Sequence, residues 1–207
     1  MLYSLRNDLK IGLSKELPGQ QAQHEMVPPG RERTRLENVT YNNPKRAAVL
    51  VLIYPKKNEP HIVLMKRNTY SGVHSNQVSF PGGKLEKFDA NLEQAAIRES
   101  NEELGIVPNQ VEILGGLTQV YIQPSHFLVN VFVGFSEKTP IFIPDTKEVT
   151  EVIEVSVSDI LAIENRRNVE IEVRGGRVEV PAYILNGHVV WGATAMMLSE
   201  LSHLIRK

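Results

Sequence analysis

The chain has 207 residues, of which 42% are hydrophobic and 23% are charged, and its formal net charge is −1 at pH 7. These values suit one globular domain with a sizeable core, and they give no electrostatic reason to expect nucleic acid or an anionic membrane as a partner. The sequence contains no cysteine, which excludes disulfides, thiolate metal sites and a cysteine nucleophile.

An amphipathic helix is predicted at the N-terminus, because leucines recur at every third or fourth position from Leu2 to Leu17. Residues 18–44 are rich in Pro, Gly, Gln and charge, which predicts an irregular connector. We therefore expect residues 1–44 to pack as a helix and connector on a main domain formed by residues 45–207.

Most of the predicted strands are short and follow this connector. Ala47–Tyr54 and His61–Lys66 are typical of two paired strands joined by the polar turn Pro55–Pro60. The first of these is the longest apolar run, yet it is far too short to span a bilayer. No signal-peptide pattern precedes it, so we expect a cytoplasmic protein. Further strands are predicted at residues 111–121, 127–135, 151–155, 170–173, 177–180 and 183–190.

Helices are predicted between and after these strands. A short helix is expected to begin at Ser158, and a longer one to run from about Gly192, with an apolar stripe that packs on the core. Strands before and after a central helix, with another helix at the end, predict an α/β layered domain.

The central helix follows the loop Phe-Pro-Gly-Gly at residues 80–83. The proline fixes one φ angle and the two glycines permit positive φ, so the backbone of this loop can approach a ligand or an ion. Asn91 can cap the start of the helix, Asp89 can cap it or brace the loop, and Gly105 is well placed to end the helix.

Three carboxylates share one face of this helix. At about 100° per residue, Glu102 and Glu103 lie roughly 60° and 40° to either side of Glu99. Ile97 and Leu104 fall on the opposite side, which predicts the packing face. The like charges repel one another unless water or a cation offsets them. The pattern is typical either of a solvated acidic surface or of a site for Mg²⁺ or Mn²⁺.

The loop and the helix together resemble the box of the Nudix hydrolase family, G-x5-E-x7-R-E-U-x-E-E-x-G-U, in which U is a bulky apolar residue. The first half departs from this pattern, because Asp89 stands in the place of the first glutamate and residues 90–97 are one more than the family spacing. Ser100 occupies the first U position. The matching positions are Gly83, Arg98, Glu99, Glu102, Glu103, Gly105 and Ile106.

An upstream element extends the resemblance to the coenzyme A pyrophosphatase subgroup, which carries L-x-x-R-(x)n-H-x-x-Q-(V/I)-(A/S)-F-P-G-G. Residues 64–83 follow this pattern, with Asn76 where the subgroup commonly has glycine. In the subgroup the element is associated with coenzyme A recognition. The resemblance therefore implies substrate-binding roles for Arg67, His74 and Gln77, and phosphate binding by Arg67 suits its guanidinium group.

The family resemblance implies an α/β/α sandwich around a mixed β-sheet, and a pyrophosphatase that depends on Mg²⁺ or Mn²⁺. Carried over to this sequence, Glu99 and Glu103 are the expected metal ligands, and Glu102 is a further ligand or a group that orients water. The carbonyl of Gly83 is expected to complete the metal shell. Arg98 precedes Glu102 by four residues, which suits an ion pair that fixes this carboxylate.

The general base lies outside the box in some members of the family. Glu148 and Glu151 are the candidates in this sequence, and Glu102 is the rival within the box. Both outer glutamates can also be read as solvated residues where a strand begins.

The expected reaction is cleavage of coenzyme A or a derivative to 3′,5′-ADP and a 4′-phosphopantetheine species. The alternatives are a Nudix enzyme for ADP-ribose, dinucleoside polyphosphates or nucleotide sugars, and a Nudix fold that only binds nucleotides. The intact set of three glutamates argues against a pure binding module. We expect a small-molecule substrate, neither nucleic acid nor membrane as a partner, and a monomer or homodimer.

Overall fold

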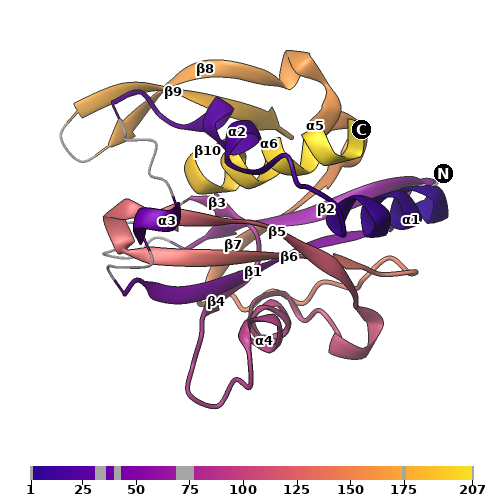
Figure 1. Cartoon of the computed structure of the whole chain (residues 1–207). Helices are drawn as coiled ribbons and strands as arrows, with labels where there is room; N and C mark the ends of the chain where they lie inside the picture. The colour runs from indigo at the N-terminus through magenta and orange to yellow at the C-terminus, as the bar shows by residue number, and fades with distance from the viewer. Residues whose placement is uncertain (1, 31–35, 40–42, 69–76, 174–175, 207) are drawn as a thin grey trace.

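The computed structural model describes residues 2–30, 36–39, 43–68, 77–173 and 176–206 (Figure 1). The helices are α1 (Leu2–Leu13), α2 (Gly19–Gln23), α3 (Leu36–Val39), α4 (Leu92–Leu104), α5 (Val157–Leu161) and α6 (Gly192–Arg206). The strands are β1 (Lys45–Lys56), β2 (Glu59–Arg67), β3 (Val78–Ser79), β4 (Gly82–Lys84), β5 (Glu112–Ile122), β6 (Phe127–Phe135), β7 (Val149–Ser156), β8 (Arg166–Val173), β9 (Gly176–Leu185) and β10 (His188–Trp191).

Seven strands form a mixed sheet in the order β3-β2-β1-β6-β5, with β4 also paired to β1 and β7 also paired to β2. The β1–β6 pair is parallel, whereas β1 runs antiparallel to β2 and β4. Strands β8, β9 and β10 form a separate antiparallel sheet. The predicted strand at residues 170–173 lies within β8, but the predicted strands at 177–180 and 183–190 are divided differently, because β9 runs without a break to Leu185 and β10 begins at His188. The sequence pattern also does not reveal that these strands leave the main sheet.

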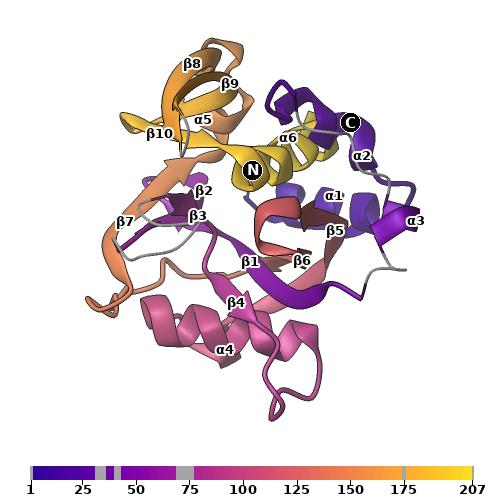
Figure 2. The same ribbon diagram turned by 90° about the vertical axis from the view of Figure 1, so that its left-hand side faces the viewer.

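Helices cover both faces of the seven-stranded sheet, with α4 on one face and α6 and α1 on the other (Figures 1 and 2). Strand β1 shows why, because its side chains alternate between the two faces. Val51 and Ile53 belong to the core beneath α6, Leu50 and Leu52 belong to the core beneath α4, and all four are 0% exposed. The expected α/β/α sandwich around a mixed sheet is therefore confirmed.

The hairpin between β1 and β2 is tighter than expected. The strands extend through both prolines, so that Pro55 pairs with Pro60 and the turn contains only Lys57 and Asn58. These two residues have φ values of 50° and 66°, as in a two-residue turn that matches the twist of the strands.

The N-terminal region contains more helix than the sequence predicts. Helix α1 ends at Leu13 rather than near Leu17, and the predicted connector contains α2, α3 and a 3-10 helix at His24–Met26. Leu9 of α1 is only 1% exposed and belongs to the core beneath α6. The boundary that we expect near residue 44 stays a prediction.

Helix α5 is also capped differently from the expectation. The hydroxyl of Ser156 accepts a hydrogen bond from the backbone N–H of Asp159 at 3.0 Å, so Ser156 is the cap. Ser158, the expected cap, instead donates to Glu59. Within the described part of the chain, no helix is both long and apolar enough to cross a membrane.

Candidate active site

The glycine pair in β4 brings the backbone against two neighbours at once. A Cβ atom at Gly82, whose φ is 145°, would lie 2.3 Å from the carbonyl oxygen of Ala48. A Cβ atom at Gly83 would lie 2.4 Å from Cδ of Glu99. Both positions therefore require glycine, and Gly83 allows the Glu99 carboxylate to lie directly on the backbone of β4.

Helix α4 begins and ends at the residues that its sequence indicates. Asn91 is the N-cap, and its side-chain oxygen accepts a hydrogen bond from the backbone N–H of Gln94 at 2.9 Å. Gly105 ends the helix with a φ of 70°. Ser100 is 0% exposed and donates to the Ala96 carbonyl at 2.7 Å, which explains how a polar residue occupies a buried position in the box.

Glu103 is a buried carboxylate rather than part of a solvated acidic face. Its exposed fraction is 1%, and its two oxygens accept hydrogen bonds from Nη1 of Arg67 and the backbone N–H of Gly82, each at 2.8 Å. Burial raises the pKa of Glu103 to about 7, against the opposing influence of Arg67 and the Gly82 N–H. The carboxylates thus turn partly toward the sheet, contrary to the expectation that they lie opposite the packing face.

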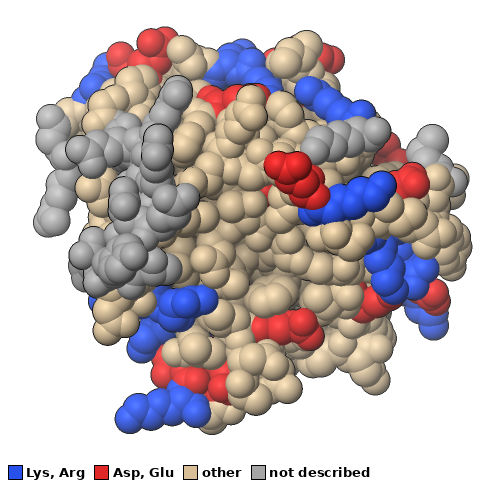
Figure 3. All heavy atoms as spheres, viewed as in Figure 1, with Lys and Arg blue, Asp and Glu red and all other residues tan. Residues whose placement is uncertain are grey.

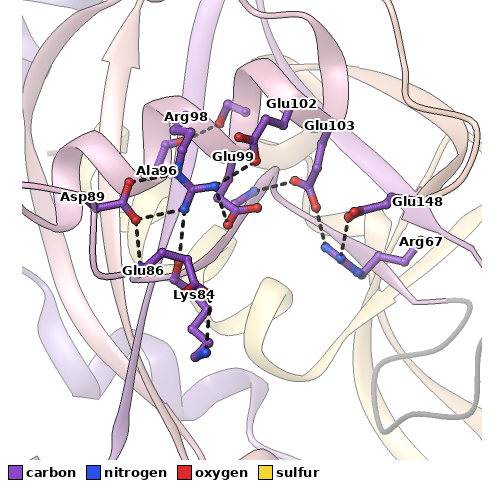
Figure 4. A network of polar contacts seen from close by, with 12 residues as sticks. Arg67, Lys84, Glu86, Asp89, Ala96, Arg98, Glu99, Glu102, Glu103 and Glu148 are labelled. Atoms are coloured by element: carbon purple, nitrogen blue, oxygen red, sulfur yellow. Dashed lines mark hydrogen bonds and ion pairs between the residues drawn. The ribbon is translucent and has the colours of Figure 1, made fainter.

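Arg98 gathers the other carboxylates of the box around its guanidinium group (Figure 4). Its Nη1 atom lies 2.9 Å from Glu99 and 2.8 Å from Glu102. The Glu99 side chain is 18% exposed and that of Glu102 is 57% exposed. Burial raises the pKa of Glu99, although Arg98 acts in the opposite direction.

Asp89 braces the loop instead of capping α4. Its two carboxylate oxygens accept hydrogen bonds from Nε and Nη2 of Arg98 at 2.8 and 2.9 Å, a bidentate arrangement. It also accepts the backbone N–H of Glu86 at 2.8 Å. These hydrogen bonds hold the pKa of Asp89 below its ordinary value, with Arg98 as the largest cause. The loop thus accommodates its extra residue, and Arg98 still contacts Asp89, which stands where the family has its first glutamate.

Arg67 and Glu148 extend the network on the other side of Glu103 (Figure 4). Nη2 of Arg67 lies 3.6 Å from a carboxylate oxygen of Glu148, whose side chain is 53% exposed. Because the same guanidinium group also contacts Glu103, Glu148 lies close to the box, and its negative charge contributes to the raised pKa of Glu99. Arg67, expected to bind substrate, contacts two carboxylates of the protein.

The remaining candidates lie in different surroundings. Glu151 of β7 points to β10, where its carboxylate lies 3.2 Å from Nε2 of His188, so the structure separates it from Glu148. The backbone carbonyl of Gln77 accepts a hydrogen bond from the N–H of Arg67 at 3.0 Å. His74 lies outside the described residues.

Asp145 is a structural residue of this site that the sequence reasoning missed. Its backbone N–H donates to the Glu103 carbonyl at 2.9 Å, and its side chain accepts from the backbone N–H of Lys147 at 2.9 Å. These bonds fix the segment that carries Glu148 against the end of α4. An aspartate that bonds the backbone two residues on is a common turn signal, and it was available in the sequence.

The fit to a divalent cation can be judged from the donor atoms. Across the described ranges, no three acidic or histidine side chains are arranged closely enough to enclose an ion. Two of the three box carboxylates nevertheless lie beside each other in a partly buried setting, and burial raises the pKa of both Glu99 and Glu103. Hard oxygen donors of this kind suit Mg²⁺ or Mn²⁺. The chemistry of the Glu99 and Glu103 oxygens therefore fits a divalent cation, and Arg98 and Arg67 hold these carboxylates in place.

Comparisons with known proteins agree with this geometry. The family model described as NUDIX domain matches residues 44–173. A relative in Enterobacter sp. (strain 638), named "Uncharacterized Nudix hydrolase NudL", is 34% identical over 160 residues, which cover 77% of this chain and 82% of that protein. A protein of the same name in Photorhabdus laumondii is 29% identical over 165 residues, covering 80% of this chain and 87% of the relative.

Solved structures show the same fold at lower sequence identity. A MutT/nudix family protein from Enterococcus faecalis has a TM-score of 0.51 and 16% identity, covering 89% of this chain and 67% of that chain. A NUDIX hydrolase from Alicyclobacillus acidocaldarius has a TM-score of 0.50 and 17% identity, covering 57% of this chain and 82% of that chain.

Proposed function

This chain belongs to the Nudix hydrolase family, and from this premise we propose that it cleaves the pyrophosphate bond of coenzyme A or a derivative. The products are 3′,5′-ADP and a 4′-phosphopantetheine species. The observation that carries the proposal is the upstream element at residues 64–83, which resembles the element associated with coenzyme A recognition.

The contacts of Arg67 support this proposal, because they join the upstream element to the box. Arg67 donates from its backbone to Gln77 at 3.0 Å, within the element, and from its side chain to Glu103 at 2.8 Å, within the box. An element that determines the substrate has to act close to the reacting bond, and this pairing provides that proximity.

Nudix enzymes generally use divalent metal ions, and we propose Mg²⁺ or Mn²⁺ here. Glu99 and Glu103 would hold the ion, with Glu102 and the carbonyl of Gly83 as further ligands. Such an ion would neutralise the negative charge on the phosphoryl oxygens and make a water molecule more nucleophilic. The Gly82 N–H meanwhile fixes the orientation of the Glu103 carboxylate.

Glu148 is the residue that we propose as general base. Its carboxylate is half exposed, so water can reach it, and its negative charge lies close enough to influence Glu99. Arg98 acts as a positioning residue, since it holds Glu99 and Glu102 rather than substrate. Glu102 stays the rival base, and the contact of Glu151 with His188 makes it the weaker candidate.

The test is a product-resolved assay over a panel of substrates that includes coenzyme A, acyl derivatives, ADP-ribose, dinucleoside polyphosphates and nucleotide sugars, with Mg²⁺ or Mn²⁺ present. We expect 3′,5′-ADP to be released most efficiently from coenzyme A or one of its derivatives. Glu103→Gln should lower kcat at least about a hundredfold, because an amide is a much weaker metal ligand than a carboxylate.

Glu93→Gln is the matched control, since Glu93 lies exposed in the first turn of the same helix. Circular dichroism and thermal unfolding should show that both variants keep the fold. Efficient turnover of ADP-ribose without any release of 3′,5′-ADP from coenzyme A would refute the proposed substrate. Metal-independent nucleotide binding without turnover would instead indicate a binding module.

A further inference from the structure

Three polar side chains lie on the face of the sheet that also carries α4, beside the box. They are Arg46 of β1, Asn130 of β6 and Gln119 of β5. Alternation along β1 places Arg46 on the same face as Leu50, which packs beneath α4. Asn130 is on the same face as Phe132, which also packs on that core. The three side chains therefore form one group, which we call the Arg46 group.

The hydrogen bonds of the Arg46 group determine how its amides are oriented. Oδ1 of Asn130 accepts from Nη2 of Arg46 at 3.1 Å and from Nε2 of Gln119 at 3.0 Å. A guanidinium group can only donate, so the atom of Asn130 that faces it must be the oxygen. Because Gln119 contacts the same oxygen, it must present its NH₂ group.

This orientation leaves the Arg46 group rich in donors. The side-chain oxygen of Asn130 is engaged twice, so its NH₂ group is directed away from both partners. Arg46 is exposed and has five N–H donors, of which this contact uses one. A positively charged fork beside an amide NH₂ group is suited to the oxygens of a phosphate group.

The strand register places the Arg46 group at a defined distance from the box. Ala48 of β1 is the partner of both Gly83 in β4 and Asn130 in β6. The order Gly83, Ala48, Asn130 therefore spans two strand spacings, or about 10 Å. Gly83 is the residue on which the Glu99 carboxylate lies. The Arg46 group thus lies about two strand spacings from the backbone on which the Glu99 carboxylate lies, close enough for one nucleotide to contact both.

We propose that Arg46, Asn130 and Gln119 form a subsite for a second phosphate group of the substrate, attached to the ribose next to the pyrophosphate. This inference rests on the proposed function, because coenzyme A carries such a group as its 3′-phosphate. Arg46 and Asn130 donate to the phosphate oxygens, and Gln119 is a positioning residue that fixes the Asn130 amide. The subsite selects substrates that carry this phosphate over those that lack it.

The test compares coenzyme A with 3′-dephospho-coenzyme A, which differ only in this phosphate. The wild-type protein should prefer coenzyme A. We expect Arg46→Gln to lower the ratio of the two kcat/KM values at least about tenfold, because a charge-assisted hydrogen bond is lost. Asn130→Asp should lower the ratio as well, since it keeps both accepted hydrogen bonds but replaces the donor with a negative charge.

Arg177→Gln is the matched control, because Arg177 is an exposed arginine whose partner is Glu170 on the hairpin of the second sheet. It should leave the ratio unchanged. Equal losses on both substrates in the Arg46 and Asn130 variants would overturn the subsite and indicate contacts with the pantetheine arm or the adenosine instead. A wild-type protein without preference between the two substrates would overturn it too.

A binding measurement separates failure of the subsite from failure of the proposed function. If neither substrate is cleaved, calorimetry of the wild-type protein with 3′,5′-ADP and with 5′-AMP still tests the second phosphate. Tighter binding of 3′,5′-ADP that is lost in Arg46→Gln supports the subsite independently of turnover. Equal affinities for the two nucleotides would overturn it.

Discussion

The absence of a Cβ atom at Gly83 determines where the Glu99 carboxylate can lie. The Glu99 carboxylate occupies the volume that any other side chain at this position would need, since an added Cβ would lie 2.4 Å from its Cδ atom. The sequence indicated a glycine loop that approaches an ion, and the structure gives this position a further reason to be glycine. The small residue sets the direction of a carboxylate that we expect to bind metal.

Gly83→Ala should weaken the binding of Mn²⁺ at least about tenfold, because Glu99 must move away from the added methyl group. The backbone carbonyl of residue 83 is retained in this variant, so a loss of Mn²⁺ affinity reflects the changed position of the Glu99 carboxylate. Titration of Mn²⁺ by electron paramagnetic resonance or calorimetry gives the dissociation constant.

Gly116→Ala is the control for a glycine in the same sheet. Its added Cβ would lie 3.4 Å from the Val131 carbonyl oxygen, which is an ordinary van der Waals contact. Metal binding should stay close to that of the wild type. Unchanged affinity in Gly83→Ala would show that Glu99 does not hold the ion in its present orientation.

At the scale of elements, the loop between β4 and α4 depends on a bidentate ion pair. The sequence identified Arg98 by its place in the box, but it left the role of Asp89 open between a cap and a brace. The structure joins the two residues at 2.8 and 2.9 Å. The sequence did not settle this because the loop geometry, including one extra residue, decides whether the aspartate reaches the helix start or the arginine.

Asp89→Asn should lower the free energy of unfolding by about 2 kcal/mol at pH 7, because charge-assisted hydrogen bonds are lost. The folded pKa of Asp89 lies below its ordinary value of 3.8, so its contribution is complete above that pH. The contribution is lost as the pH falls through the folded pKa. The gap between wild type and variant should therefore narrow in acid.

Urea unfolding at pH 7 and at several acid pH values measures this gap. A difference that does not depend on pH would mean that the pair contributes through shape and packing rather than through charge. A variant as stable as the wild type would show that Arg98 is held sufficiently by Glu99 and Glu102.

Local signals predicted individual elements better than they predicted the way in which elements combine. Asn91 and Gly105 bound α4 as expected, and β5 and β6 lie close to their predicted ranges. The same signals could not assign β8, β9 and β10 to a second sheet, because alternation along a strand says nothing of its partners. Similarly, Arg67 was expected to bind substrate, and only the three-dimensional structure brings it to Glu103.

At the scale of the whole molecule, a buried carboxylate on α6 forms hydrogen bonds with both the N-terminal region and the seven-stranded sheet. Glu200 of α6 is 0% exposed. It accepts hydrogen bonds from the backbone N–H groups of Gly19 and Thr118 at 3.1 and 3.2 Å, and from Nε2 of Gln23 at 2.7 Å. We propose on this basis that residues 1–44 fold together with residues 45–207 rather than as a separate unit.

Glu200→Ala should lower the free energy of unfolding by about 3 kcal/mol or more, since it leaves buried donors without an acceptor and creates a cavity. Unfolding of the wild-type protein should be a single transition, because the N-terminal region and the sheet share the Glu200 contact. Denaturant unfolding followed by circular dichroism and by tryptophan fluorescence gives the two curves to compare.

Glu164→Ala is the control, because Glu164 is exposed at the surface. It should change stability by less than about 0.5 kcal/mol. Two separate transitions in the wild-type protein, or selective proteolysis of its first 44 residues with the rest intact, would contradict a single cooperative unit.

Arg67 and Arg98 already compensate the charges of Glu103, Glu99 and Glu102. The negative charges of this cluster are therefore balanced by positive charges of the chain itself, unlike the ligands of small domains whose folding is driven by zinc.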